Sequence, residues 1–303
     1  MFEKLFSERG LSLDRMRVLV EVHDAGSIAQ AAPGDPIRQS QYSRQLRELS
    51  EFFGCEVAHR QGKLLKLTEQ GRRLADLARE HFRSLEDFRA ECAAESLDYT
   101  IAAGDSLLHW LVIPRLGRLV SGKQPVRFMT VSLRTLDVVQ HLADGRADFG
   151  VFRQDAVTAS LDSAALGELG YVAVVPKALL GRGKTATLKD VLGHLPLASQ
   201  TADGQFTQRV RQIAEDLGVD FRPALACQSF PQTVNAVRSG GFAAILPSLA
   251  LSELPAGGYI SVTDPALKRL KRKISLVWNP RVTQVRAGAG RLIGQLKDTL
   301  RME

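Results

Sequence analysis

The sequence predicts an α/β protein that starts with a helix-turn-helix and a basic hairpin, continues through one long helix, and ends in two α/β lobes. Two observations lead to this architecture. Residues 13–67 contain two helical patterns followed by two short strands. From Asp98 onward, apolar strands alternate with amphipathic helices, which is typical of a parallel sheet covered by helices on both faces.

The first helix is expected at Leu13–Ala25, with Gly26 placed to end it. Its apolar stripe consists of Leu13, Met16, Val20 and Val22. Ser27 is a typical N-cap for a short helix over residues 28–32, whose small side chains suit close packing. The prolines and the glycine of residues 33–36 then predict a turn.

The second helical pattern covers residues 38–49 and has one strongly polar face. Tyr42, Leu46 and Leu49 are three or four residues apart and are expected to face inward. The residues left for solvent are Gln39, Ser40, Gln41, Arg44 and Gln45. Gln, Ser and Arg side chains can bond to base edges, and an α-helix fits the major groove of DNA. We therefore predict a recognition helix.

A basic hairpin follows this helix. Residues 55–59 and 64–67 are expected to be short strands on either side of Arg60-Gln61-Gly62-Lys63. A polar helix face alone is equally compatible with a solvated helix of an ordinary α-helical domain. The order of helix, helix and basic hairpin favours DNA binding. The basic side chains expected to face phosphates are Arg38, Arg44, Arg47, Arg60, Lys63 and Lys66.

Composition adds general limits on the kind of protein. The 303 residues suffice for two or three domains, and 45% hydrophobic with 24% charged residues is ordinary for a soluble globular protein. No apolar run is long enough to span a membrane, and the first residues do not resemble a signal peptide. Three widely separated cysteines indicate reduced thiols in a cytoplasmic protein. The basic run at 268–273 is interpreted as a loop before a strand, with a second DNA or partner contact as the alternative.

One long helix is expected between the two halves of the chain, because residues 72–103 contain neither proline nor glycine. Residues four and three apart form a coiled-coil seam, which consists of Leu74, Ala78, His81, Leu85, Phe88 and Cys92. The same stripe can pack a helix against its own domain. Its place between a small domain and a new strand pattern favours dimerisation.

The second half of the chain is expected to alternate between strands and helices. The expected strands cover 99–103, 126–133, 148–152, 171–175, 196–199, 224–227, 242–246 and 273–278. The helices between and after them cover 106–119, 135–143, 188–192, 205–217, 229–239 and 282–300. Two crossings, at 171–175 and near 273–278, would join two lobes.

Ligands of open parallel sheets bind beyond the carboxyl ends of strands, at the N-termini of helices. This rule selects the following candidate effector-binding residues: Ser106, Arg134, Thr135, Gln200, Thr201, Ser229 and Pro247. Each serine or threonine can equally be an ordinary N-cap. The helix N-termini and Arg134 favour a small anion such as a carboxylate.

No enzyme or metal pattern is evident. Gly181-Arg182-Gly183-Lys184-Thr185 resembles the end of a phosphate-binding loop, but the required first glycine falls at Ala178. The histidines show no metal-ligand spacing, and no catalytic triad order occurs. We expect no enzyme activity and no cofactor. An α/β metabolite-binding protein or enzyme with an appended helical domain and no role in DNA binding is the alternative.

Three segments carry a resemblance to a known family. Residues 26–32, 39–46 and 67–71 resemble, without a gap, the winged helix-turn-helix of LysR-type transcriptional regulators. Two residues depart from the family pattern: Asp35 stands where a buried Leu is usual, and Arg38 where a capping Ser or Thr is usual. Since Pro33 and Pro36 flank the turn, the second helix is expected to end early.

The resemblance implies a winged helix-turn-helix at 1–67, a linker and dimerisation helix at 68–96, and a periplasmic-binding-protein-like (type II) effector domain at 97–303. Lobe I of that domain would comprise 97–170 and 278–303, and lobe II 171–277. The implied partners are a pseudo-palindromic double-stranded DNA operator, a small-molecule effector and a second copy, as a homodimer or homotetramer. Base contacts are expected from Gln39, Ser40, Gln41 and Arg44, and phosphate contacts from Ser27, Ser43, Arg60 and Lys63.

Overall fold

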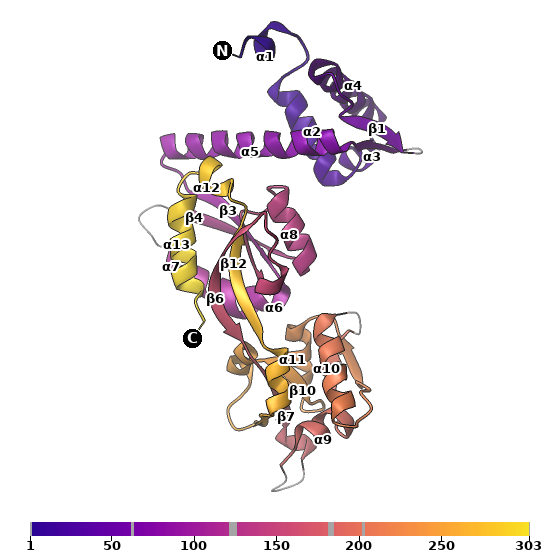
Figure 1. Ribbon diagram of the computed structural model, residues 1–303, viewed down its shortest axis with the longest axis vertical. Helices are drawn as coiled ribbons and strands as arrows, with labels where there is room; N and C mark the ends of the chain where they lie inside the picture. Colours follow the sequence, from indigo (N-terminus) through magenta and orange to yellow (C-terminus); the bar gives the residue numbers. More distant parts are fainter. Residues whose placement is uncertain (1, 62–63, 121–125, 181–184, 202–203, 303) are drawn as a thin grey trace. The chain divides into compact units, whose positions relative to one another are not determined.

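The structure, a computed structural model, describes residues 2–61, 64–120, 126–180, 185–201 and 204–302. The chain forms two compact units. The first consists of Met1–Glu95 and Thr283–Ala287, and the second of Ser96–Val282 and Gly288–Glu303. Figure 1 labels the helices and strands of both units.

The first unit contains the helix-turn-helix, the wing and the long helix. Its elements are α1 (Glu3–Ser7), α2 (Leu13–Ala25), α3 (Ile28–Ala31), α4 (Pro36–Phe53), β1 (Ala58–Gln61), β2 (Leu64–Leu67) and α5 (Glu69–Cys92). The wing strands β1 and β2 pair in antiparallel fashion, with Arg60 opposite Leu65. The predicted wing residues Gly62 and Lys63 lie outside the described residues.

The ends of the first helices follow from local chemistry. Gly26 ends α2 with a φ of 81°, a left-handed conformation that glycine adopts without steric cost. The Ser27 hydroxyl caps α3 by accepting from the Gln30 N–H. α3 ends at Ala31, one residue before the predicted end. The recognition helix starts at Pro36, two residues earlier than predicted, because the Asp35 carboxylate accepts from the Arg38 N–H.

The core of the first unit corrects the predicted stripe of α2. The fully buried residues of this helix are Val18, Leu19 and Val22, whereas the side chain of Leu13 is 67% exposed. The inward-facing residues of α4 are Tyr42, Leu46 and Leu49, as predicted, and they pack with those of α2 in one cluster.

The predicted seam of α5 divides into two parts. Ala78 is buried and Leu74 packs against the core of its own domain. The rest of the predicted seam is exposed, as His81, Leu85, Phe88 and Cys92. The exposed fractions of Leu85 and Phe88 are 55% and 65%. An apolar surface therefore remains on the C-terminal half of α5.

Two guanidinium–carboxylate pairs hold α5. Arg79 donates to both oxygens of Asp24 on α2, over 2.6 and 3.0 Å. Arg286 donates to both oxygens of Asp87, over 2.7 and 3.0 Å, and the Ala287 N–H donates to the same carboxylate. The Asp87 and Arg286 side chains are 7% and 5% exposed, so this is a buried bidentate ion pair.

Lobe I of the second unit is built on a five-stranded sheet in the order β4-β3-β5-β12-β6. Its strands are β3 (Leu97–Ala103), β4 (Val126–Ser132), β5 (Phe149–Arg153), β6 (Asp162–Leu169) and β12 (Arg272–Trp278). Its helices are α6 (Asp105–Leu107), α7 (Ile113–Val120), α8 (Thr135–Ala143) and α13 (Ala289–Leu300). The short helix α12 (Val282–Val285) lies, apart from its first residue, in the segment that belongs to the first unit. In this sheet α8 covers one face, and α7 and α13 lie on the other (Figure 1). A π-helical turn, η1 (Leu108–Val112), joins α6 to α7.

Lobe II carries two smaller sheets, in the orders β10-β7-β11 and β8-β9. Its strands are β7 (Tyr171–Pro176), β8 (Ala198–Gln200), β9 (Leu225–Cys227), β10 (Ala244–Pro247) and β11 (Tyr259–Val262). Its helices are α9 (Leu188–Gly193), α10 (Gln205–Asp216) and α11 (Phe230–Arg238), with short 3-10 turns η4 (Ser248–Glu253) and η5 (Pro265–Leu270). Two further 3-10 turns, η2 (Gln154–Ala156) and η3 (Lys177–Leu179), follow β5 and β7.

The sheets differ from the predicted all-parallel arrangement. β3 pairs in parallel with β4 and β5, but β12 is antiparallel to both β5 and β6. The strands β6 and β11 were not predicted. All of β12 belongs to the sheet of lobe I, so the chain returns to that lobe before Arg272 and not at residue 278. The predicted final helix is interrupted, with Gly288 at φ 70° between α12 and α13.

The basic run at 268–273 has an ordinary structural role. Its first residues form the turn η5 and its last ones begin β12. Arg269 pairs with Asp216, and Lys271 with Glu168. The loop-before-strand interpretation is therefore confirmed.

Gly71, in the first turn of α5, lies against the base of the wing. A Cβ atom at this position would stand 1.9 Å from the carbonyl oxygen of Val57 and 2.8 Å from its carbon. Backbone atoms cannot move aside as the end of a flexible side chain can. Only glycine allows α5 to start this close to the strand.

We predict that Gly71→Ala destabilises the DNA-binding unit by about 2–3 kcal/mol or more, because the methyl group overlaps a backbone carbonyl. Thermal unfolding followed by circular dichroism measures the effect. Gly117→Ala is the matched control, since no atom lies within 4 Å of its added Cβ and it lies in the helix α7. Equal melting temperatures for Gly71→Ala and wild type would contradict the prediction.

Candidate nucleic-acid interface and effector cleft

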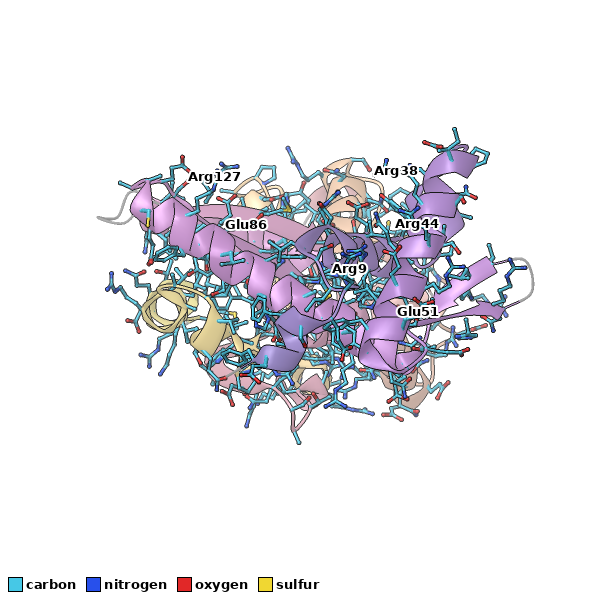
Figure 2. The ribbon with its side chains drawn as sticks, turned by 90° about the horizontal axis from the view of Figure 1, so that it is seen from above. Arg9, Arg38, Arg44, Glu51, Glu86 and Arg127 are labelled. Carbon is cyan, nitrogen blue, oxygen red and sulfur yellow. The ribbon has the colours of Figure 1, made fainter. Side chains whose placement is uncertain are left out.

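The recognition helix α4 presents a polar face because its apolar residues are used in the core. Tyr42, Leu46 and Leu49 are at most 5% exposed. The residues on the opposite side are exposed, and they include Ser40, Gln41, Ser43, Arg44 and Arg47. Figure 2 shows Arg38, Arg44 and Glu51 along this helix.

A groove of about 580 Å³ lies between α4, the start of α3 and the wing. The predicted DNA-binding residues that line it are Gln39, Ser40, Ser43, Arg44, Arg47 and Arg60. Residues that the sequence did not single out complete the lining: Ile28, Ala29, Pro36, Leu64 and Leu65. Guanidinium groups from both the helix and the wing thus converge on one open groove, which is the arrangement that phosphate binding requires.

The arginines of the groove are held loosely. Arg44 lies 3.4 Å from Glu48 and Arg47 lies 3.8 Å from Glu51, and both arginine side chains are more than two-thirds exposed, at 68% and 69%. Exposed pairs of this kind contribute little to stability. Glu48 also pairs with Arg15 on α2, so its carboxylate stays neutralised when Arg44 turns to a ligand. Exchanging these contacts for DNA contacts therefore costs little.

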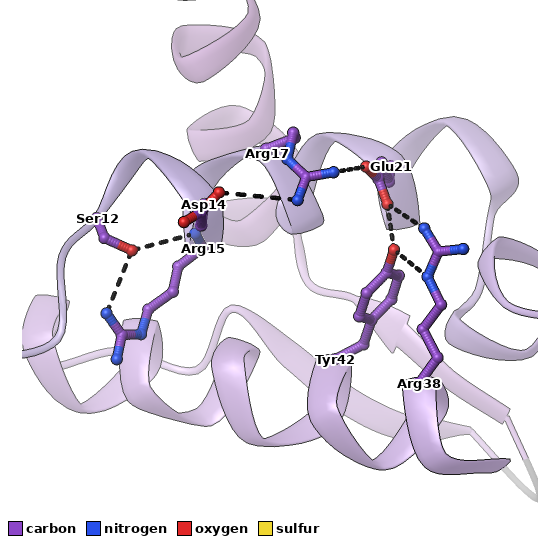
Figure 3. Close-up of polar contacts among 7 residues, drawn as sticks. All are labelled: Ser12, Asp14, Arg15, Arg17, Glu21, Arg38 and Tyr42. Atoms are coloured by element: carbon purple, nitrogen blue, oxygen red, sulfur yellow. Dashed lines mark hydrogen bonds and ion pairs between the residues drawn. The ribbon is translucent and has the colours of Figure 1, made fainter. Parts of the chain in front are cut away.

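Arg38 is held more firmly, through a relay to α2 (Figure 3). Its Nε–H donates to the Tyr42 hydroxyl over 2.8 Å, and the Tyr42 hydroxyl in turn donates to Glu21. The Arg38 guanidinium also lies 3.5 Å from Glu21 and 5.2 Å from the centre of the Tyr42 ring. Burial, followed by the hydrogen bond to Glu21, raises the pKa of Tyr42. Arg38 thus helps to fix the start of α4 and does not line the groove.

The other predicted DNA-binding residues take different places. The side chain of Ser27 is fully buried and bonded to Gln30, so its hydroxyl does not face solvent. Gln39 lines the groove but donates to the Ala32 carbonyl over 2.7 Å. Gln41 is exposed on α4 outside the groove lining. Lys63 is outside the part of the chain that the structure describes.

The predicted effector residues of lobe I lie at one edge of its sheet. Since β3 and β4 are parallel neighbours, with Ala103 opposite Ser132, their carboxyl ends meet. Ser106 lies in α6, directly after β3, and Thr135 is the first residue of α8, after β4. Both side chains are partly buried. Arg134 is exposed at the N-cap position of α8.

The predicted residues of lobe II also lie together. Gln200 ends β8 and donates to the Thr233 hydroxyl over 2.8 Å. The Thr201 N–H donates to the Cys227 carbonyl at the end of the parallel neighbour β9. Ser229 caps α11 by accepting from the Gln232 N–H, which is the ordinary N-cap role. Pro247 is buried at the end of β10.

A polar contact between the lobes was not predicted. On the π-helical turn η1, Trp110 donates its Nε1–H to the Glu253 carboxylate over 2.8 Å, and His109 Nε2 lies 2.6 Å from the same oxygen. The Trp110 ring is buried among apolar residues of lobe II, which include Val172, Val234 and Leu246. Burial of Glu253 opposes ionisation, but the bonds from Trp110 and His109 outweigh it, so the pKa of this carboxyl lies below its usual value. We call this contact the lobe clasp.

Within the described residues, no group of three or more His, Cys, Asp or Glu side chains is arranged to hold a metal ion. The helices of the same residues include none that is long and apolar enough to cross a membrane.

A helix-turn-helix with a wing, a long helix and two α/β lobes define the architecture of an effector-responsive transcriptional regulator. Residues 13–72 match the bacterial regulatory helix-turn-helix protein family named lysR, and residues 94–301 match the LysR substrate binding domain. The chain belongs to the LysR family of DNA-binding transcriptional regulators. This confirms the predicted family and fold class, and it places the chain among regulators and not among enzymes.

Several relatives match nearly the whole chain. The probable nitrogen assimilation transcriptional activator of Synechococcus elongatus is 25% identical over 279 residues, 88% of each protein. The full-length regulator LysG of Corynebacterium glutamicum, solved with its effector Arg bound, has a TM-score of 0.63 and 18% identity over 96% of this chain and 100% of its own. DarR of Vibrio fischeri, solved in complex with DNA, has a TM-score of 0.55 and 15% identity over 95% and 99%.

We predict distinct effects for the two halves of the groove. Losing Arg44 is expected to cost about 1–3 kcal/mol of binding free energy and to relax base preference, because this side chain would bond to base edges. Losing Arg60 is expected to weaken binding to all DNA sequences alike and to reduce the slope of log K against log salt by roughly one. Selection of duplexes from a randomised library measures base preference. Titrations of the selected duplexes at several salt concentrations measure affinity and the salt slope.

Arg89→Ala is the matched control, because Arg89 is 81% exposed on α5 and lies outside the groove. Unchanged affinity and preference in Arg44→Ala would show that α4 does not read the bases.

Proposed function

We propose that this regulator reads its operator with α4, holds the phosphates with the wing, and responds to a small anion bound between lobes I and II. The observation that carries the DNA-binding part is the groove in which Arg44 and Arg47 of the helix meet Arg60 of the wing. Its open walls and weakly paired guanidinium groups suit a polyanion. The proposed base-reading set is Gln39, Ser40, Gln41 and Arg44, and the proposed phosphate-binding set is Ser43, Arg47, Arg60 and Lys63. Ser27 is left out because it is buried, and Arg38 because Tyr42 and Glu21 hold it.

The proposed effector site lies where the carboxyl ends of β3 and β4 face lobe II. Support comes from the contact between α6, which carries Ser106, and α11, which Ser229 caps. Thr135, Gln200 and Thr201 end or follow the neighbouring strands. Main-chain N–H groups at the starts of helices favour an anionic group.

The proposed assembly is a homodimer formed through the exposed apolar part of α5. Leu85 and Phe88 are exposed in the single chain, and their spacing fits a helix–helix seam. A two-fold dimer would place two copies of α4 on the two halves of a pseudo-palindromic operator. An effector then acts by binding two arrangements of this dimer unequally, since only differential affinity shifts an equilibrium.

We predict that replacing Leu85 and Phe88 together by glutamate produces monomers in analytical ultracentrifugation, because charges would be buried in an apolar seam. Leu136→Glu is the matched control, since Leu136 is 75% exposed on α8 and does not belong to the predicted seam of α5. A dimer that persists in the double variant would assign the assembly to another surface.

We also predict that small carboxylates raise the melting temperature of the wild-type protein by mass action. Ser106→Ala and Thr135→Ala are expected to reduce the shift, whereas Ser163→Ala, an exposed position on β6, is expected to leave it unchanged. A thermal-shift screen of the three variants is the measurement. Hits that act equally on all three would place the effector elsewhere.

A further inference from the structure

Three aromatic rings form a cluster at the start of lobe II. The ring centres of Tyr171 and Phe206 are 5.0 Å apart, those of Phe206 and Phe230 are 4.9 Å apart, and those of Tyr171 and Phe230 are 6.0 Å apart. The rings come from the first residue of β7 and from the first turns of α10 and α11. All three are partly buried, so each keeps an accessible part.

This aromatic cluster borders the proposed effector site. Tyr171 lies opposite Pro247 in the β7–β10 pairing, and Phe230 directly follows Ser229. Phe206 lies one residue before Thr207, whose hydroxyl donates to the Gln200 carbonyl. The residues predicted from the sequence are thus polar neighbours of an apolar surface.

Three arginines lie beside the same cluster. Arg272 is the first residue of β12 and pairs with Leu169, two residues before Tyr171. Arg209 lies on α10, three residues after Phe206, and Arg153 ends β5. Besides burial, the pKa of Arg272 is influenced by Arg209, Tyr171, Asp155 and Arg153, and Asp155 is the carboxylate among them.

The positive charge of the three arginines is incompletely neutralised by carboxylates. Asp155 pairs with Arg153 over 2.8 Å. Arg209 and Arg272 donate only to main-chain carbonyls, those of Arg269 and Lys271, over 3.3 and 3.4 Å. Neither forms an ion pair with a carboxylate of the described chain. Burial, and after it the repulsion by Arg209, lowers the pKa of Arg272. Burial also raises the pKa of Tyr171 to about 12, so its phenol remains neutral and supplies no counter-charge.

We propose that Arg272 and Arg209 bind the carboxylate of the effector while Tyr171, Phe206 and Phe230 pack against its planar apolar body, so that the effector class is a small aromatic carboxylate. This inference rests on the proposed function and specifies the ligand of its cleft. Two neighbouring guanidinium groups repel each other until an anion lies between them, and bidentate bonds from guanidinium to carboxylate are strong. Aromatic rings favour an aromatic partner in stacked or edge-to-face contact.

The test uses three probes on the full-length protein in isothermal titration calorimetry: benzoate, the uncharged benzyl alcohol, and acetate, which lacks the ring. Benzoate is expected to bind more tightly than either of the others. Arg272→Gln and Arg209→Gln are each expected to weaken benzoate binding by about tenfold or more. Phe206→Leu is expected to narrow the preference for benzoate over acetate.

Arg211→Gln is the matched control, because Arg211 is exposed on the same helix two residues after Arg209 and so points away from the cluster. A thermal unfolding curve of Arg272→Gln that matches that of the wild type in the absence of ligand, followed by circular dichroism, shows that this variant is folded.

Benzyl alcohol binding as tightly as benzoate would overturn the anion site, as would wild-type benzoate affinity in Arg272→Gln or no benzoate binding to the wild type at millimolar concentration. The proposed function has a separate outcome. If Thr135→Ala abolishes benzoate binding and Arg272→Gln does not, the cleft is the effector site and only the role of the arginines is wrong.

Discussion

The position of the linker helix α5 depends on two ion pairs, in each of which an arginine donates to both oxygens of one carboxylate. Arg79 and Asp24 join it to α2, and Arg286 and Asp87 join it to the segment between α12 and α13. A buried charge without its partner is costly, so the buried pair of Arg286 and Asp87 is expensive to open, whereas Asp24 is 42% exposed and can be solvated. The second pair links residues 199 positions apart in the chain. It ties α5 to residues 283–287, which belong to the same unit although most of the second unit lies between them in the chain.

Local chemistry made much of the fold predictable. Leu13–Ala25 and Thr135–Ala143 have the predicted bounds because a cap or a terminating glycine lies next to a periodic stripe. Whether neighbouring strands run parallel or antiparallel was harder to predict from the sequence. β12 and β6 pair with partners far away in the sequence, and nothing near Asp162 or Arg272 states whether that partner runs parallel or antiparallel. Asp35 shows how a departure from a family pattern can be compensated, since its carboxylate supplies the cap that Arg38 cannot.

The candidate sites divide in the same way. The exposed face of α4 follows from the spacing of Tyr42, Leu46 and Leu49, so the sequence alone predicted that Ser40, Arg44 and Arg47 are exposed. Tertiary contacts decided the rest: Ser27 is enclosed by its neighbours, and Arg38 is occupied by Tyr42 and Glu21. Arg153, Arg209 and Arg272 come from three distant strands and helices. No spacing rule connects them. The chain passes from lobe I to lobe II between β6 and β7 and returns between η5 and β12, and Arg272 lies at that return.

The lobe clasp affects the rates at which an effector could enter and leave the site between the lobes. Trp110 fills a place in the apolar interior of lobe II, and its N–H together with His109 satisfies Glu253. Separating the lobes would expose the indole and leave a carboxylate without donors. An effector that needed a wide opening to enter would therefore wait on that event, and its residence time would be governed by the clasp. An effector that could enter while the clasp stays closed would dissociate at a rate set only by its own contacts with the protein.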